Sequence, residues 1–127
     1  MAGKSSETSG APRIHHLALR TRAVDALAAF YRELLGLEEV RADKPRSVWL
    51  GLGDGAVLMI EARGDTEPVV PPGSLELFAL RVSEERKREI RDAAMSRGSF
   101  DGETAYTVYL RDPDGRRVGV STHPLVV

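Results

Sequence analysis

The sequence contains no cysteine among its 127 residues. This absence excludes disulfide frameworks, thiolate nucleophiles and cysteine-ligated zinc sites. No apolar run approaches the roughly 20 residues that a membrane-spanning helix requires. Residues 1–12, MAGKSSETSGAP, also lack the apolar stretch of a signal peptide. We therefore expect a soluble, cytoplasmic protein that has no membrane partner.

An excess of charge of one sign is lacking too, because 18 basic and 19 acidic residues leave a net charge of −1. We expect no nucleic-acid partner, since the chain has no one-signed field to hold a phosphate backbone. Residues 84–89, EERKRE, place acids before bases at the i,i+4 spacing of a solvated helix face. The length allows one domain with a core and is too short for two.

What the sequence does contain is a duplicated unit. The segment HLALRT at 16–21 is answered by LFALRV at 77–82, and Asp-Gly pairs follow at 54–55 and 114–115. The two offsets along the chain differ by a single residue. A repeat of this length is one supersecondary unit duplicated, and two such units can enclose a shared site.

Hydrophobic periodicity predicts the same order of elements, β-α-β-β-β, in both units. In the first unit we expect a strand at 14–19, a helix over 24–35 capped by Gly36, and strands near 40, at 47–52 and at 56–61. In the second we expect a strand at 75–82, a helix from its N-cap Ser83 to Gly98, and a closing hairpin of 104–110 and 117–122.

Composition divides the chain further. Residues 1–12 are small and polar and are expected to form a flexible tail. Residues 64–73 hold three prolines and two glycines, which predicts a linker. The first module therefore spans about 13–63 and the second about 74–123 of a single domain at 13–127.

Three motifs carry a resemblance to a known family: IHHLALRT at 14–21, AFYRELLGLEEV at 29–40 and VYLRDPDGRRVGV at 108–120. With them, residues 14–122 resemble the vicinal oxygen chelate superfamily of glyoxalase I, bleomycin-resistance proteins, fosfomycin-resistance thiol transferases and extradiol dioxygenases. The resemblance implies an α+β fold in which two tandem β-α-β-β-β modules form a curved mixed-sheet cup with helices outside. It also implies a homodimer.

The family commonly holds a divalent metal with His and Glu side chains. Carried over by motif, its metal positions fall on His16, Met59, Leu77 and Gly119. Only His16 is a metal ligand, whereas a stable site needs three or four donors. We therefore expect neither the usual metal site nor a cofactor. One alternative stays open, a divalent metal relocated onto His16, Glu61 and His123.

Strand alternation predicts what the cup contains, because side chains two residues apart share a face. Trp49 and Tyr109 take equivalent places in the two modules and suit a small, partly aromatic or amphipathic ligand, unless they fill a core or a dimer contact. The predicted ligand-binding residues are His16, Arg20, Trp49, Met59, Glu61, Leu77, Tyr109 and Ser121. His16 and Glu61 are also candidates for an acid-base pair. His15 is expected to face the helices.

The leading interpretation is a metal-independent protein that binds a small molecule and resembles the bleomycin-resistance type. The main alternative is an enzyme, either a lyase, isomerase or thiol transferase with the relocated metal, or a metal-free enzyme that uses His16 and Glu61. A third is a degenerate domain that acts as a ligand sensor or assembly partner, with its cup plugged by side chains. The fold match does not choose among these chemistries.

Overall fold

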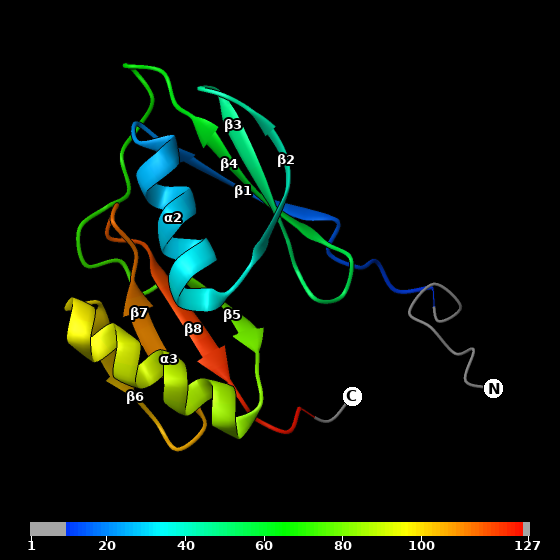
Figure 1. The fold of residues 1–127 in the computed structure, drawn as a ribbon, viewed down its shortest axis with the longest axis vertical. Coiled ribbons are helices and arrows are strands. Elements are labelled where there is room, and N and C mark those ends of the chain that lie inside the picture. The colour runs from blue at the N-terminus through cyan, green and yellow to red at the C-terminus, as the bar shows by residue number, and fades with distance from the viewer. Residues whose placement is uncertain (1–9, 126–127) are drawn as a thin grey trace.

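The computed structural model describes residues 10–125, which form two successive β-α-β-β-β modules (Figure 1). The first module holds β1 (His16–Thr21), α2 (Val24–Leu35), β2 (Glu38–Asp43), β3 (Ser47–Gly51) and β4 (Val57–Ala62). The second holds β5 (Leu77–Arg81), α3 (Glu84–Arg97), β6 (Phe100–Glu103), β7 (Thr107–Arg111) and β8 (Arg117–Ser121). Residues 1–9 of the expected tail lie outside the described residues.

Each module has its own four-stranded mixed sheet. The strand orders are β1-β4-β3-β2 and β5-β8-β7-β6. The first strand of each module pairs in parallel with the last, and the other pairs are antiparallel. This topology confirms the predicted α+β fold of two equivalent modules. No helix within residues 10–125 is long and apolar enough to cross a membrane.

The helices end where the sequence predicts. Gly36 has φ of 74° and its N–H bonds back to α2, while Gly98 has φ of 76° after α3. Glycine adopts this left-handed conformation without a steric penalty, so it closes a helix readily. Helix α3 begins where the Oγ of Ser83 accepts a hydrogen bond of 3.1 Å from the Arg86 N–H. That bond satisfies one of the free donors of the first turn.

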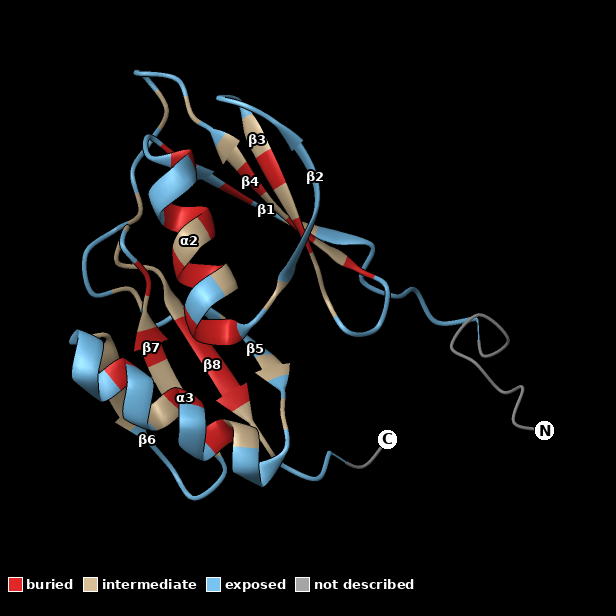
Figure 2. Cartoon of the chain, in the orientation of Figure 1, coloured by how far each residue is buried: buried red, intermediate tan, exposed pale blue. Residues whose placement is uncertain are grey.

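The strands bury one face and leave the other open. Val48, Leu50, Leu58 and Ile60 are fully buried, while the alternate residues of β3 and β4 are half-buried or exposed. Figure 2 shows this alternation along β3. Because successive side chains of a strand point to opposite faces, only one face of each sheet packs against the helices.

One strand of the second module differs from the expected boundaries. The expected strand at 104–110 is β7, which covers Thr107–Arg111 because the chain turns at 104–106. The strand before it, β6, covers Phe100–Glu103 and has no counterpart among the expected ranges. Asp101 and Gly102 have low strand propensity, and the pairing register shifts between Phe100 and Glu103. The strand is therefore fixed by its pairing with β7, which the local sequence does not reveal.

The two modules join through their helices. Helix α2 contacts α3 as well as its own sheet, and the Tyr31 ring stacks on Phe78 of β5 with ring centroids 6.3 Å apart. Buried hydrophobic residues of both modules belong to one continuous core.

Each sheet has one face turned away from the helices, and we call these two surfaces the open faces. That of module 1 carries His16, Ala18, Arg20, Arg41, Ser47, Trp49, Met59 and Glu61, and that of module 2 carries Leu77, Ala79, Arg81, Thr107, Tyr109, Arg111, Arg117, Gly119 and Ser121.

Candidate functional site

The centre of the open face of module 1 is an aromatic residue covered by a cation. Pairing across the sheet aligns Ala18, Met59, Trp49 and Arg41 in one row. The Arg41 guanidinium lies 4.9 Å from the Trp49 ring centroid, within the range of a cation–π contact. The Trp49 side chain is half-buried, so part of its ring is available to a ligand.

Module 2 repeats the arrangement. Its central row aligns Ala79, Gly119 and Tyr109, and the Arg117 guanidinium lies 3.9 Å from the Tyr109 ring centroid. A Cβ at Gly119 would lie 3.4 Å from the Ala79 side chain, 3.2 Å from that of Thr107 and 3.6 Å from the Tyr109 ring. The glycine at the family's last metal position therefore leaves room chiefly for the Thr107 methyl group, with the Tyr109 ring beside it.

A second arginine lies beside this stack. Arg111 and Arg117 both donate from Nε to the same Asp101 oxygen, at 2.9 and 3.0 Å. Two cations share one carboxylate, so this end of the open face carries a net positive charge. Sequence reasoning missed these residues and Arg41. Strand parity was the available signal, because Arg111 lies two residues after Tyr109 and Arg117 two before Gly119.

His16 lies at one end of the open face of module 1, next to His15. The Nδ1 atoms of the two imidazoles are 3.0 Å apart, and both side chains are exposed. The expectation that His15 faces the helix layer is therefore wrong. Its carbonyl accepts a hydrogen bond of 3.2 Å from the Val57 N–H of β4, while its exposed ring lies edge-on to that of His16, with centroids 5.2 Å apart.

Glu61 lies at the other end of the same face. The register pairs His16 with Val57 and Arg20 with Glu61, which separates His16 from Glu61 by four residues along the strands, or about 13 Å. Arg20 donates to Glu61 at 3.3 Å and to Glu67 at 2.6 Å. The Arg20 hydrogen bond, followed by one from the Gly64 N–H, lowers the pKa of Glu67 to about 2. The predicted acid-base pair is therefore not formed within one chain.

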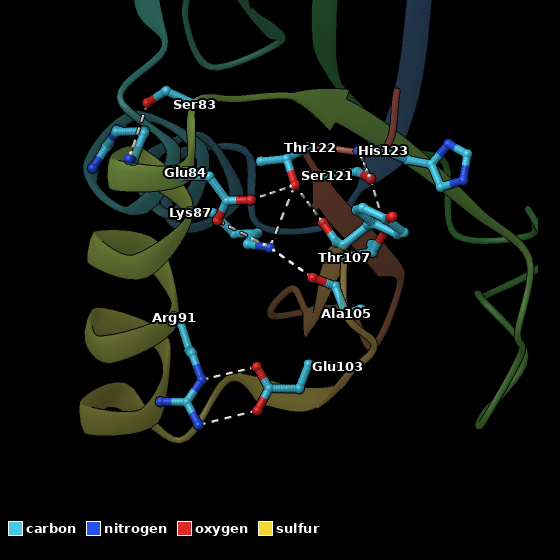
Figure 3. Close-up of polar contacts among 12 residues, drawn as sticks. Ser83, Glu84, Lys87, Arg91, Glu103, Ala105, Thr107, Ser121, Thr122 and His123 are labelled. Carbon is cyan, nitrogen blue, oxygen red and sulfur yellow. Dashed lines mark hydrogen bonds and ion pairs between the residues drawn. The ribbon is translucent and has the colours of Figure 1, made fainter. Parts of the chain in front are cut away.

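His123 and Ser121 lie at the end of β8. The Ser121 Oγ accepts from Thr107 Oγ1 at 2.7 Å and from the His123 N–H at 3.1 Å (Figure 3). The His123 imidazole points away from these hydroxyl groups and contacts the Tyr106 ring, with centroids 4.7 Å apart. Ser121 thus has its hydroxyl engaged on the open face of module 2.

The residues present do not fit the divalent metal of the resembled family. Its four positions hold one imidazole, one thioether, one alkyl side chain and a glycine, which supply too few donors. The residues of the relocated site are not brought together within one chain, because residues 10–125 contain no group of three His, Asp or Glu side chains that could hold a metal ion. No chemical step through a metal follows from these side chains.

The chain was compared with models of protein families and with solved structures. Residues 13–120 match the model of the Glyoxalase/Bleomycin resistance protein/Dioxygenase superfamily. A possible glyoxalase from Bacillus cereus is similar at 23% identity and a TM-score of 0.73, over 87% of this chain and 99% of that chain. A lactoylglutathione lyase from Agrobacterium tumefaciens is similar at 24% identity and a TM-score of 0.66, over 86% and 92%. A glyoxalase/dioxygenase from Nostoc punctiforme reaches a TM-score of 0.74 at 18% identity, over 89% and 92%. Similarity to structures at this level of identity establishes the fold alone.

Proposed function

The chain belongs to the glyoxalase/bleomycin resistance protein/dioxygenase superfamily, and from this premise we propose that it binds a small, partly aromatic or amphipathic molecule against its open faces. The observation that carries the proposal is the equivalence of Trp49 and Tyr109. Each lies in the central row of its sheet, is left half-buried by the single chain, and has an arginine over its ring. Such rings provide apolar contact area with a defined orientation.

The surrounding side chains support a ligand with a polar or anionic end. Around Tyr109, Arg111 and Arg117 outnumber their shared partner Asp101, and guanidinium groups pair well with carboxylates. In this proposal the Trp49 and Tyr109 rings form the walls of the ligand-binding site. The proposed contacts around them are His16, Arg20, Met59, Glu61, Leu77 and Ser121.

The proposal includes a second copy of the chain. Residues of the first strands are exposed on both open faces, and Leu77 is 42% exposed at the end of one of them. The two sheets are also separate, since the strand pairings of residues 10–125 do not join them. Covering the open faces with those of a partner protomer buries Leu77 and encloses a ligand held by Trp49 and Tyr109, which supports a homodimer.

Binding without metal and without catalysis completes the proposal. The family's metal positions retain only His16 as a donor, and the register separates His16 from Glu61, so no described observation favours the enzyme alternatives. A cytoplasmic location is also proposed, supported by the absence of cysteine.

The first test uses Trp49 as its own reporter, because it is the only tryptophan of the chain. Naphthoic acids and polycyclic phenols are titrated against the protein while its fluorescence is followed. We expect saturable quenching, and a loss of affinity of about tenfold in Tyr109→Leu. Tyr106→Leu is the matched control, since Tyr106 is 44% exposed outside the open face. Unquenched fluorescence across the set, or an equal loss in the control, contradicts an aromatic ligand at this site.

The second test concerns the partner copy. Sedimentation is expected to give twice the chain mass of 13.9 kDa. Leu77→Asp places a charge on the exposed row of β5 and is expected to shift the protein to monomer and to weaken the fluorescent ligand together. If the wild-type protein is monomeric and still binds the ligand, the site between two protomers is wrong, and the ligand is bound by one chain alone.

A further inference from the structure

A separate cavity lies where the two modules meet, away from Trp49 and Tyr109. It has a volume of about 380 Å³ and lies at the ends of β1 and β4, beneath the linker and beside the turn that follows β7. Four arginines and one acid line it together with apolar linker residues: Arg20, Arg22, Arg63, Arg116, Asp114 and Val69. A concave, strongly basic surface of this kind is a candidate site for an anion.

Two of the arginines extend from neighbouring strands. Thr21 at the end of β1 pairs with Ala62 at the end of β4, and the Arg63 N–H bonds to the Thr21 carbonyl at 2.9 Å. Arg22 and Arg63 are the residues that directly follow β1 and β4. Like charges at neighbouring strand positions repel each other, and a bound anion relieves that repulsion.

The same two arginines have the least carboxylate compensation. Arg20 donates to both Glu61 and Glu67. By contrast, Arg63 donates to the main-chain carbonyls of Gly64 and Glu67. The Arg22 guanidinium has Asp65 at 4.0 Å, and the Asp65 side chain is 99% exposed, so this pair is weak.

Asp114 adds a hydrogen-bond acceptor to the same cavity. Its Oδ2 atom is buried without a hydrogen-bond partner and lies 3.7 Å from Arg116 Nη1. Because 29% of the Asp114 side chain is exposed, the accessible part of its carboxylate can accept a hydrogen bond from a ligand donor. The cavity therefore presents two guanidinium groups for an anion and one acceptor for a donor such as a hydroxyl group.

We propose that this cavity binds a phosphorylated hydroxy compound of the sugar-phosphate class. Arg22 and Arg63 bind the phosphate oxygens, since a guanidinium pairs with phosphate through two parallel hydrogen bonds. A ligand hydroxyl donates to the exposed part of the Asp114 carboxylate, and the carbon chain lies against Val69. This site is distinct from the aromatic site of the proposed function, because Trp49 and Tyr109 do not line it.

The test measures binding of ribose 5-phosphate and of inorganic phosphate by calorimetry at constant ionic strength. We expect ribose 5-phosphate to bind more tightly, and Arg22→Gln to weaken both by about tenfold. Arg88→Gln is the matched control, because it removes the same charge from an exposed position on α3. An equal loss in Arg88→Gln, or no binding of either compound, overturns the proposal.

Asp114→Ala separates a specific hydroxyl contact from general electrostatics. Removing a negative charge favours every anion, so inorganic phosphate is expected to bind as well as before or more tightly. Ribose 5-phosphate is expected to bind more weakly, because it loses its acceptor. If both compounds gain affinity, the hydroxyl contact is wrong and the sugar-phosphate assignment falls. Thermal melting of each variant without ligand confirms that it is folded.

Discussion

The Tyr31 hydroxyl of α2 donates a hydrogen bond of 2.8 Å to Oδ2 of Asp112, which lies in the turn after β7. The bond joins the two modules, and both side chains are withdrawn from solvent. Burial, followed by the charge of Asp112, raises the pKa of Tyr31 well above its ordinary range. Asp112 Oδ1 also accepts from the N–H groups of Asp114 and Arg116 at 2.9 and 3.0 Å, so the carboxylate shapes this turn.

Tyr31→Phe removes this bond while keeping the ring that stacks on Phe78. Asp112 retains its other donors, so we expect the free energy of unfolding to fall by about 1–2 kcal/mol. Urea titration measures the change, and Tyr106→Phe at an exposed position is the control. An unchanged midpoint for Tyr31→Phe contradicts a stabilising role for the bond.

Acid is expected to weaken the ion pair between Arg20 of β1 and Glu67 of the linker. The folded-state pKa of Glu67 is about 2, below its usual value of about 4.3. Because the folded pKa is depressed, the stability contribution is present above about pH 4.3 and is lost as the pH falls toward 2. The melting temperature of Glu67→Gln should therefore lie below that of wild type at pH 7, with the gap closing in acid. A gap that is constant with pH, or an equal gap in Glu76→Gln, contradicts this linkage.

Gly119→Val tests the space that a glycine leaves beside the Thr107 methyl group and the Tyr109 ring. Even the first side-chain carbon would lie 3.2 Å from the Thr107 methyl group, and valine adds two more carbons. We expect a loss of about 1–3 kcal/mol in the free energy of unfolding, together with weaker binding of aromatic ligands. Gly53→Val is the control, since a Cβ there meets nothing within 4 Å. Equal effects at both positions contradict the packing argument.

Removing divalent metal should change neither stability nor ligand binding. The reason is the donor set at the family's metal positions, where only His16 carries a ligand. Elemental analysis of protein purified without chelator, followed by melting with added zinc, nickel, manganese or iron, makes the measurement. Stoichiometric metal with a clear rise in melting temperature would show that another donor set exists.

Much of the secondary structure could be predicted from the sequence, because it depends on interactions between residues close together in the chain. Helical spacing gave α2, the Gly36 and Gly98 caps ended the helices, and Gly55 and Gly115 adopt φ of 94° and 85° in the two equivalent turns. Each of these features depends on residues a few positions apart. The strict alternation of β3 and β7 likewise placed Trp49 and Tyr109 on equivalent faces.

Long-range register decided what the sequence left open. Periodicity says that His16 and Glu61 share a face, but only the pairing of β1 with β4 sets them four residues apart. Partners such as Arg20 and Glu67, or Tyr31 and Asp112, are far apart in the chain and meet only after the modules pack. The sequence by itself determined the elements and their faces, because those follow from local sterics and burial. Tertiary structure decided which polar groups meet, since a hydrogen bond depends on ångström-scale distances that packing alone fixes.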